Sequence, residues 1–226
     1  MKKDKKWLKK TVKTVTTTKH LLSNLSIIVR TSQYHLFKKI TNPNRKSKVL
    51  DVGVTSNEIL KDSNIFERIY EYKDKLTAAT IEDVVQFRRL YPTIKSVKIY
   101  PKKKLPFKDN SYDVVTAWAT VEHVGDYKDQ QFFLNELLRV GKKIFVTTPY
   151  RAGFYEPHTG IFFLHWLPLK LFRLFCNLIG KNFWASPENL NPLYIRDIKK
   201  MKLIKNVRVK IYYTLNILPT HIIISN

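Results

Sequence analysis

Short apolar runs alternate with segments of helical spacing along most of this chain. The runs are bounded by turn-forming residues, as buried strands are, and they occupy residues 49–52, 76–81, 94–99, 113–117 and 143–148. Between them, apolar positions recur at helical spacing in residues 59–70, 84–90 and 130–140. Continuous apolar strands that alternate with helices predict a parallel sheet with both faces covered.

The C-terminal segment departs from this alternation. Residues 206–215 and 220–225 have the pattern of two strands joined around Asn216 and Pro219. Because a parallel connection needs about a dozen residues or more, these two strands must be antiparallel. The whole pattern therefore predicts a doubly wound α/β fold, in which a mostly parallel seven-stranded sheet ends in a C-terminal antiparallel hairpin.

Charge divides the chain into two parts. The 226 residues carry a formal net charge of +23, and the first 48 of them contain 14 Lys or Arg and one acid. We expect residues 1–46 to form a basic N-terminal extension, partly helical or disordered, and residues 47–226 to form one domain. We expect no transmembrane span and no secretory signal, so that a cytoplasmic location is the default.

The first 22 residues interleave lysines with the apolar residues Trp7, Leu8, Val12 and Val15. This pattern suits peripheral contact with an anionic membrane at its inner face, and it also suits an arm that binds nucleic acid. A solvated, poorly ordered tail is the plain alternative. Cys176 is the single cysteine and the histidines are scattered, so we expect neither a disulfide nor a metal site.

Three segments carry a family resemblance. Residues 48–53 read KVLDVG, residues 105–124 read LPFKDNSYDVVTAWATVEHV, and residues 147–175 read TTPYRAGFYEPHTGIFFLHWLPLKLFRLF. The first two resemble the first strand with its glycine turn and the fourth strand of class I S-adenosylmethionine-dependent methyltransferases. Residues 49–57, VLDVGVTSN, are similar to a bacterial type 11-like subgroup with a DVGVTSD-type turn. The third segment resembles the acceptor-side insertion of that subgroup, at about residues 150–200.

This resemblance implies a cofactor site for S-adenosylmethionine at the turn after the first strand. Asp51 ends that strand, and Gly53 lets the backbone approach the methionine end closely. Thr55 and Asn57 stand where the family usually has glycines. The Thr55 hydroxyl could replace a ligand contact, and helix capping by Ser56 or Asn57 is the alternative.

The remaining cofactor contacts are implied on three further loops. Glu82 is the expected partner of the ribose hydroxyls, with Asp83 as second choice or as a helix N-cap. Lys102 lies where the family has a residue near adenine, next to Tyr100 and Pro101, so adenine would be contacted by backbone or by Tyr100. The loop formed by Trp118 and Ala119 completes the predicted set.

The acceptor side is less defined by the sequence. We expect a small-molecule, glycan or lipid-linked acceptor, bound beneath the aromatic residues of the insertion, although these aromatics also suit a plain core. His158 is the first candidate for a general base and His123 the second. The alternatives are a catalytically lapsed fold that serves as a binding or scaffold module and, third, an RNA methyltransferase; the latter would bind RNA in a salt-dependent way.

Overall fold

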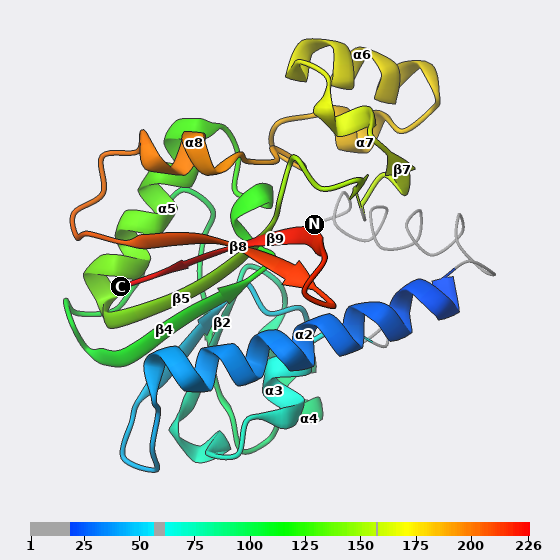
Figure 1. The fold of residues 1–226 in the computed structure, drawn as a ribbon. Coiled ribbons are helices and arrows are strands. Elements are labelled where there is room, and N and C mark those ends of the chain that lie inside the picture. Colours follow the sequence, from blue (N-terminus) through cyan, green and yellow to red (C-terminus); the bar gives the residue numbers. More distant parts are fainter. Residues whose placement is uncertain (1–18, 57–61, 157) are drawn as a thin grey trace.

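The computed structural model of the chain describes residues 19–56, 62–156 and 158–226. A seven-stranded sheet with the order β3-β2-β1-β4-β5-β9-β8 runs through its centre (Figure 1). Strands β3, β2, β1, β4 and β5 are parallel, whereas β9 is antiparallel to β5 and to β8. The predicted fold class, a mostly parallel sheet that ends in an antiparallel hairpin, is confirmed. The strands are β1 Val49–Val52, β2 Leu76–Thr80, β3 Lys95–Lys98, β4 Tyr112–Trp118, β5 Gly141–Pro149, β8 Arg208–Thr214 and β9 Leu218–Ser225.

Helices cover both faces of this sheet. One face packs against α5 and α8, and the other packs against α2, α3 and α4. The helices are α2 Lys19–Thr41, α3 Ile65–Ile69, α4 Val84–Leu90, α5 Tyr127–Val140, α6 Leu169–Leu178, α7 Asn182–Ala185 and α8 Ile195–Lys199. Short 3-10 turns are η1 Lys73–Lys75, η2 Val121–His123 and η3 Leu164–Trp166. All four residues of β1 and all five of β2 are buried, so both faces of these strands are covered, as in a parallel sheet.

Helix α3 is shorter than its sequence pattern predicts. Asn64 adopts a left-handed conformation with φ 50°, and the helix begins at the next residue. A residue in that conformation cannot continue a right-handed helix from upstream. The first part of the predicted helix, residues 59–61, lies outside the described residues.

Helix α2 brings the N-terminal part of the chain onto the sheet. Its Phe37 is completely buried, and the ring packs edge-on against Phe66 and Phe145 at centroid distances of 5.1 and 5.6 Å. Burial of such a ring stabilises the fold by about 1.5–3 kcal/mol. The C-terminal half of the basic extension thus belongs to a covering layer of the sheet. Residues 1–18, which hold most of the predicted membrane-contact segment 1–22, lie outside the described residues.

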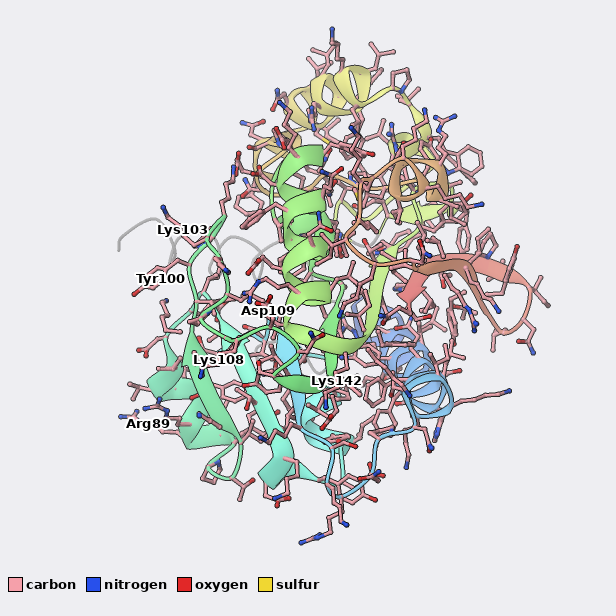
Figure 2. All side chains as sticks on the ribbon, turned by 90° about the vertical axis from the view of Figure 1, so that its left-hand side faces the viewer. Arg89, Tyr100, Lys103, Lys108, Asp109 and Lys142 are labelled. Carbon is pink, nitrogen blue, oxygen red and sulfur yellow. The ribbon has the colours of Figure 1, made fainter. Side chains whose placement is uncertain are left out.

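The turn before β4 is fixed by one arginine of α5. The Arg139 guanidinium donates to the carbonyl oxygens of Leu105 and Phe107 at 3.0 and 2.8 Å. It also pairs with Glu136 and with Asp109, which lies on this loop at the surface (Figure 2). The Glu136 carboxylate in turn accepts from the Leu105 backbone N–H at 2.7 Å. This network holds the register in which β4 enters the sheet.

A small unit inserted between β5 and α8 projects beyond the carboxyl ends of the strands (Figure 1). It contains the two-stranded β6 Tyr155–Glu156 and β7 Ile161–Phe162, followed by α6 and α7. Phe172, Cys176, Ala185 and Leu190 form its own small core. In the part of the chain that the structure describes, no helix is both long and apolar enough to cross a membrane.

Candidate functional site

The glycine turn after β1 lies at the point where the strand order reverses, since β1 has β2 on one side and β4 on the other. In open α/β sheets, ligands bind at such a point, outside the carboxyl ends of the strands. Gly53 has φ +105°, and a Cβ added to it would lie 2.4 Å from Thr120 Oγ1. The turn therefore requires glycine for two reasons, its conformation and its contact with the loop after β4.

Glu82 reaches this turn from the end of β2. Its Oε2 accepts from the Ser56 backbone N–H at 2.7 Å, from the Ser56 hydroxyl at 2.6 Å and from the Thr55 hydroxyl at 3.1 Å. The predicted ribose partner and the predicted turn residue are thus brought together. Among the described residues, every hydrogen bond to the Glu82 carboxylate goes to Oε2, so Oε1 keeps its lone pairs for a ligand hydroxyl.

Asp83, the second choice, caps α4 instead. Its Oδ1 accepts from the Val85 backbone N–H at 2.8 Å, which is the usual bond of an N-cap aspartate. The Thr55 backbone is held separately, because the Asn64 side chain accepts from its N–H at 3.2 Å and donates to its carbonyl oxygen at 2.9 Å. The turn after β1 is therefore fixed from both sides.

Asp51 lies beneath this turn, buried to 4 % exposure. Burial raises the pKa of Asp51 well above its usual range, and the adjacent Glu67 carboxyl adds to the effect. Arg30 of α2 acts in the opposite direction on Asp51, and it likewise opposes the rise that burial causes in the pKa of Glu122. Arg30 thus brings a positive charge to this edge of the sheet from residues 1–46, which were predicted to be an extension.

Lys102 and Tyr100, which were predicted to lie near adenine, are found on exposed loops. Lys102 forms ion pairs with Asp129 and Glu188, both at 2.9 Å, and so ties its loop to α5 and to the insertion. Tyr100 is 67 % exposed and lies on the outer loop after β3 (Figure 2). Neither residue therefore lies in an enclosed adenine slot.

The loop after β4 begins with the two other predicted residues. The Trp118 ring stacks on Phe66 at a centroid distance of 5.3 Å, and its indole N–H is buried without a partner among the described residues. Ala119 has φ 51°, a conformation uncommon for a residue with a side chain, and its N–H donates to the Thr147 carbonyl oxygen at 2.9 Å. This strained backbone directs the loop towards Gly53.

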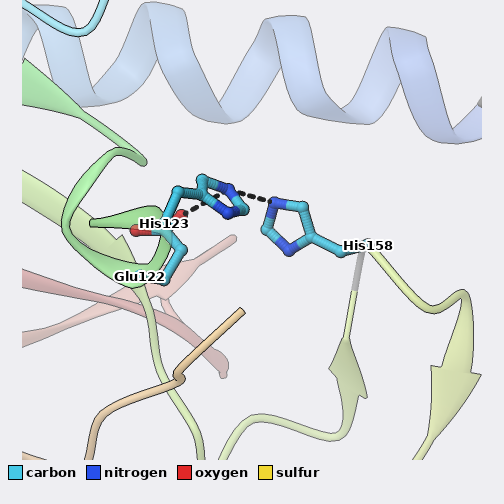
Figure 3. Close-up of side chains that lie close together, drawn as sticks. All are labelled: Glu122, His123 and His158. Carbon is cyan, nitrogen blue, oxygen red and sulfur yellow. Dashed lines mark hydrogen bonds and ion pairs between the residues drawn. The ribbon is translucent and has the colours of Figure 1, made fainter. Parts of the chain in front are cut away.

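The two predicted histidines meet. His123 follows β4 and His158 belongs to the insertion, and their Nε2 atoms are 3.0 Å apart (Figure 3). His123 Nδ1 faces the Asn189 carbonyl oxygen at 2.6 Å, and His158 Nδ1 faces Glu156 Oε1 at 2.6 Å. Since both Nδ1 atoms face acceptors, both carry a hydrogen, and one further hydrogen lies between the two Nε2 atoms.

The charges around the pair decide which histidine holds that hydrogen. Burial opposes protonation of His158, but the Glu156 carboxylate outweighs it and raises the pKa of His158. Burial acts against ionised Glu156 as well, yet His158 lowers the pKa of Glu156 to about 2. Burial, together with the nearby His158, lowers the pKa of His123 to about 3. His158 is therefore the cation, paired with Glu156, and His123 is neutral.

Glu122 completes this group. Its side chain is fully buried, its Oε2 accepts from the Thr148 hydroxyl at 2.9 Å, and its Oε1 has no hydrogen-bond partner among the described residues. Burial raises the pKa of Glu122. Oε1 lies 3.8 Å from His123 Nε2. No pattern in the sequence predicted Glu156 or Asn189 at this site, because each comes from a separate part of the insertion.

Residues 74–144 match a family model described as a methyltransferase domain. A comparison with curated proteins finds no match. Among solved structures, the fold is similar to a candidate methyltransferase from Bacillus halodurans, with a TM-score of 0.54 and 13 % identity over 86 % of this chain and 97 % of that one.

Two further structures resemble the chain with slightly lower TM-scores. The YcgJ protein from Bacillus subtilis has a TM-score of 0.50 and 13 % identity, over 84 % of this chain and 95 % of that one. The trans-methyltransferase CalH, in its complex with SAH, has a TM-score of 0.50 and 13 % identity, over 84 % of this chain and 54 % of that one. The strand order and these likenesses define the class I methyltransferase fold.

The matched segment runs from the end of η1 into β5 and thus includes Glu82, Trp118 and His123. Together with the fold, it supports methyl transfer as the class of reaction and S-adenosylmethionine as the cofactor. At the turn after β1, three donors from Thr55 and Ser56 converge on one carboxylate oxygen, Oε2 of Glu82, which a methionine carboxylate would have to displace. Donors of this kind are what the methionine carboxylate needs.

Proposed function

We propose that this chain transfers a methyl group from S-adenosylmethionine to a bulky acceptor, either a glycan, a lipid-linked intermediate or another small molecule, that binds beneath the insertion. The observation that carries the proposal is the contact between the insertion and the core at His158 and His123, next to the edge of the sheet where Gly53 meets Thr120. An acceptor held under the insertion would face the methyl group there.

Four residues would hold the cofactor in this proposal. Gly53 permits the close backbone approach, and Glu82 Oε1 accepts from the ribose. Thr55 and Ser56 donate to the methionine carboxylate once it displaces Glu82 Oε2, to which they donate in the structure. When bound, S-adenosylmethionine supplies an electrophilic methyl group on a sulfonium. The protein's part is to align the acceptor with that methyl group and to exclude water, which can supply most of the acceleration.

The surface of the insertion supports an apolar acceptor. It carries many of the exposed large apolar side chains of the described residues, and several of them lie on α6. Leu174 is 51 % and Leu178 71 % exposed. Exposed apolar patches of this kind mark binding sites for apolar partners. A lipid-linked acceptor would provide such a partner.

The histidine pair remains the candidate for proton acceptance, which is needed only when the acceptor atom must lose a proton. All four ring nitrogens of His123 and His158 already have partners. For a hydroxyl acceptor, His123 Nε2 would have to release His158 before it could act as a base. A nitrogen or carbon acceptor with an available electron pair needs no such step.

Calorimetry with S-adenosylhomocysteine tests the cofactor assignment. Wild-type protein should bind one equivalent, and a Gly53→Arg variant that remains folded should not. Incubation of cell extract with methyl-labelled S-adenosylmethionine then tests the acceptor. Label in the organic-soluble fraction supports a lipid-linked acceptor, whereas label confined to RNA would contradict the proposal.

A second candidate function is a binding module that has lost catalysis. It is favoured by Glu82, whose carboxylate already satisfies the donors of the turn. Binding of S-adenosylhomocysteine separates the two functions: the lapsed module would show none at millimolar ligand, and its cellular role would survive Gly53→Arg.

A further inference from the structure

Glu122, His123 and His158 each direct one ligand atom into the same small volume. These three atoms lie within 4.8 Å of one another (Figure 3). Two of the side chains come from the loop after β4, and the third comes from the insertion, 35 residues further along the chain. The group shares no residue with the proposed cofactor site, which Gly53, Thr55, Ser56 and Glu82 form.

The distances between these ligand atoms are close to those between the ligands of one metal ion. Zinc–nitrogen bonds of about 2.0–2.1 Å at tetrahedral angles place two nitrogen ligands about 3.3 Å apart. The two Nε2 atoms are 3.0 Å apart, and Glu122 Oε1 is 3.8 Å from His123 Nε2. All three atoms lie within 4.8 Å of one another, so side-chain torsions that bring the Glu122 carboxylate closer would give each atom its place around one ion.

Each of the three side chains is oriented by a partner on its other side. His123 donates from Nδ1 to a backbone carbonyl oxygen, and His158 donates from Nδ1 to the Glu156 carboxylate. Glu122 Oε2 accepts from the Thr148 hydroxyl. Metal-binding histidines have this arrangement almost always, because a carbonyl or carboxylate on Nδ1 fixes the tautomer that presents the Nε2 lone pair.

Glu122 Oε1 is an independent sign of a missing ligand. The side chain is fully buried, yet this oxygen has no hydrogen-bond partner in the described part of the chain. A buried acceptor without a partner costs about 1–3 kcal/mol. A cation between the histidines would give this oxygen its partner.

We infer that Glu122, His123 and His158 bind one divalent transition-metal ion, with Zn²⁺ as the first choice. Two imidazoles and one carboxylate are ligands that Zn²⁺ accepts, whereas Mg²⁺ and Ca²⁺ prefer oxygen alone. The ion replaces the hydrogen that the two Nε2 atoms share, and that hydrogen leaves as a proton to solvent. The side chain of His123 is 32 % exposed, so the site has a path of entry.

Binding of Zn²⁺ and Co²⁺ to the full-length protein, freed of metal by a chelator, tests this inference without any cofactor. Calorimetry should give one ion per chain. X-ray absorption of the zinc-loaded wild type should show two imidazole nitrogens and at least one oxygen at about 2.0–2.2 Å. Since neither measurement uses S-adenosylmethionine, failure here leaves the proposed function standing, and failure of cofactor binding leaves the metal site standing.

Variants then identify the ligands. His158→Ala and Glu122→Gln should each weaken Zn²⁺ binding by a factor on the order of 100 or more. Glu156→Gln, which removes only an orienting charge, should weaken it by roughly 10–100-fold. His35→Ala is the matched control, because His35 is exposed on α2 and lies outside the site. It should bind as the wild type does.

The inference is overturned if wild-type protein shows no saturable binding up to millimolar Zn²⁺. Sulfur in the coordination shell, or binding that persists in both His123→Ala and His158→Ala, would overturn it as well. If a histidine variant fails to fold, the absorption spectrum of the wild type still decides, since it counts imidazole ligands directly.

Discussion

Glu82 and Ser56 lie on the loops that follow two neighbouring strands, and two hydrogen bonds join them. The Ser56 backbone N–H at 2.7 Å and the Ser56 hydroxyl at 2.6 Å both donate to Oε2 of Glu82. This link connects the turn after β1 with the end of β2. It leaves the other oxygen of Glu82 available. The same side chain can therefore brace the turn and accept a ligand hydroxyl.

Replacement of Glu82 should weaken cofactor binding. Glu82→Gln keeps the shape but removes the charge that strengthens these hydrogen bonds, and Glu82→Ala removes both. We expect the dissociation constant for S-adenosylhomocysteine to rise by roughly 10-fold in Glu82→Gln and further in Glu82→Ala, as measured by calorimetry. Asp83→Asn is the control, because Asp83 caps α4. Tighter binding in Glu82→Ala would mean that Glu82 blocks the site.

Gly53→Ala should destabilise the protein through a particular contact. The added Cβ would meet Thr120 Oγ1 at 2.4 Å, and φ +105° is unfavourable for alanine. We expect a loss of about 2–3 kcal/mol in the free energy of unfolding, measured in urea.

Two controls separate the contact from the backbone strain in Gly53→Ala. Gly180→Ala has φ +73° and no atom within 4 Å of its Cβ, so it should lose only about 1 kcal/mol. In a Thr120→Ala background, Gly53→Ala should cost less than in the wild type. Equal costs in both backgrounds would rule out the contact.

Arg139→Lys should destabilise the turn before β4. A lysine cannot reproduce the fork that reaches Glu136 and the carbonyl oxygens of Leu105 and Phe107. Hydrogen bonds of charged groups contribute about 1.5–3 kcal/mol, so we expect a loss of about 2–3 kcal/mol in chemical denaturation. Asp109→Ala removes only the exposed partner and should leave the unfolding midpoint nearly unchanged. The reverse order of the two variants would contradict this account.

His221 should make the fold sensitive to acid. Burial, with help from the charges of Arg30 and His158, lowers the pKa of His221 to about 3. Between pH 6.5 and 3 the unfolded chain therefore protonates this histidine and the folded chain does not, so acidification favours unfolding by up to about 1.4 kcal/mol per pH unit.

His221→Gln should flatten the dependence of unfolding free energy on pH in that window. Buried Asp51 and Glu122, whose pKa values are raised, act with the opposite sign, but they are present in both proteins. The difference in slope between wild type and variant, measured by urea denaturation at several pH values, isolates His221. Parallel curves would show that His221 does not titrate in this way.

The sheet could be predicted from sequence because its information is local. Residues 49–52 and 76–80 are mostly apolar and do not alternate with exposed polar residues, and a strand of that kind must be covered on both faces. The place of Glu82 beside the turn after β1 was also predictable, since the carboxyl ends of neighbouring parallel strands meet at one edge of the sheet. The helical pattern of residues 59–70 was wrong about where α3 begins, because Asn64 adopts a left-handed conformation.

What only the tertiary structure decided is which distant polar groups meet. His123 and His158 are 35 residues apart, and Glu156 follows no apolar periodicity that would predict its place beside them. Arg30 belongs to a basic segment that reads as an extension, yet α2 lies against the sheet. Apolar patterning fixes which residues are buried, but the pairing of polar side chains depends on the path of the whole chain, so the sequence determined the fold and the tertiary structure determined the site.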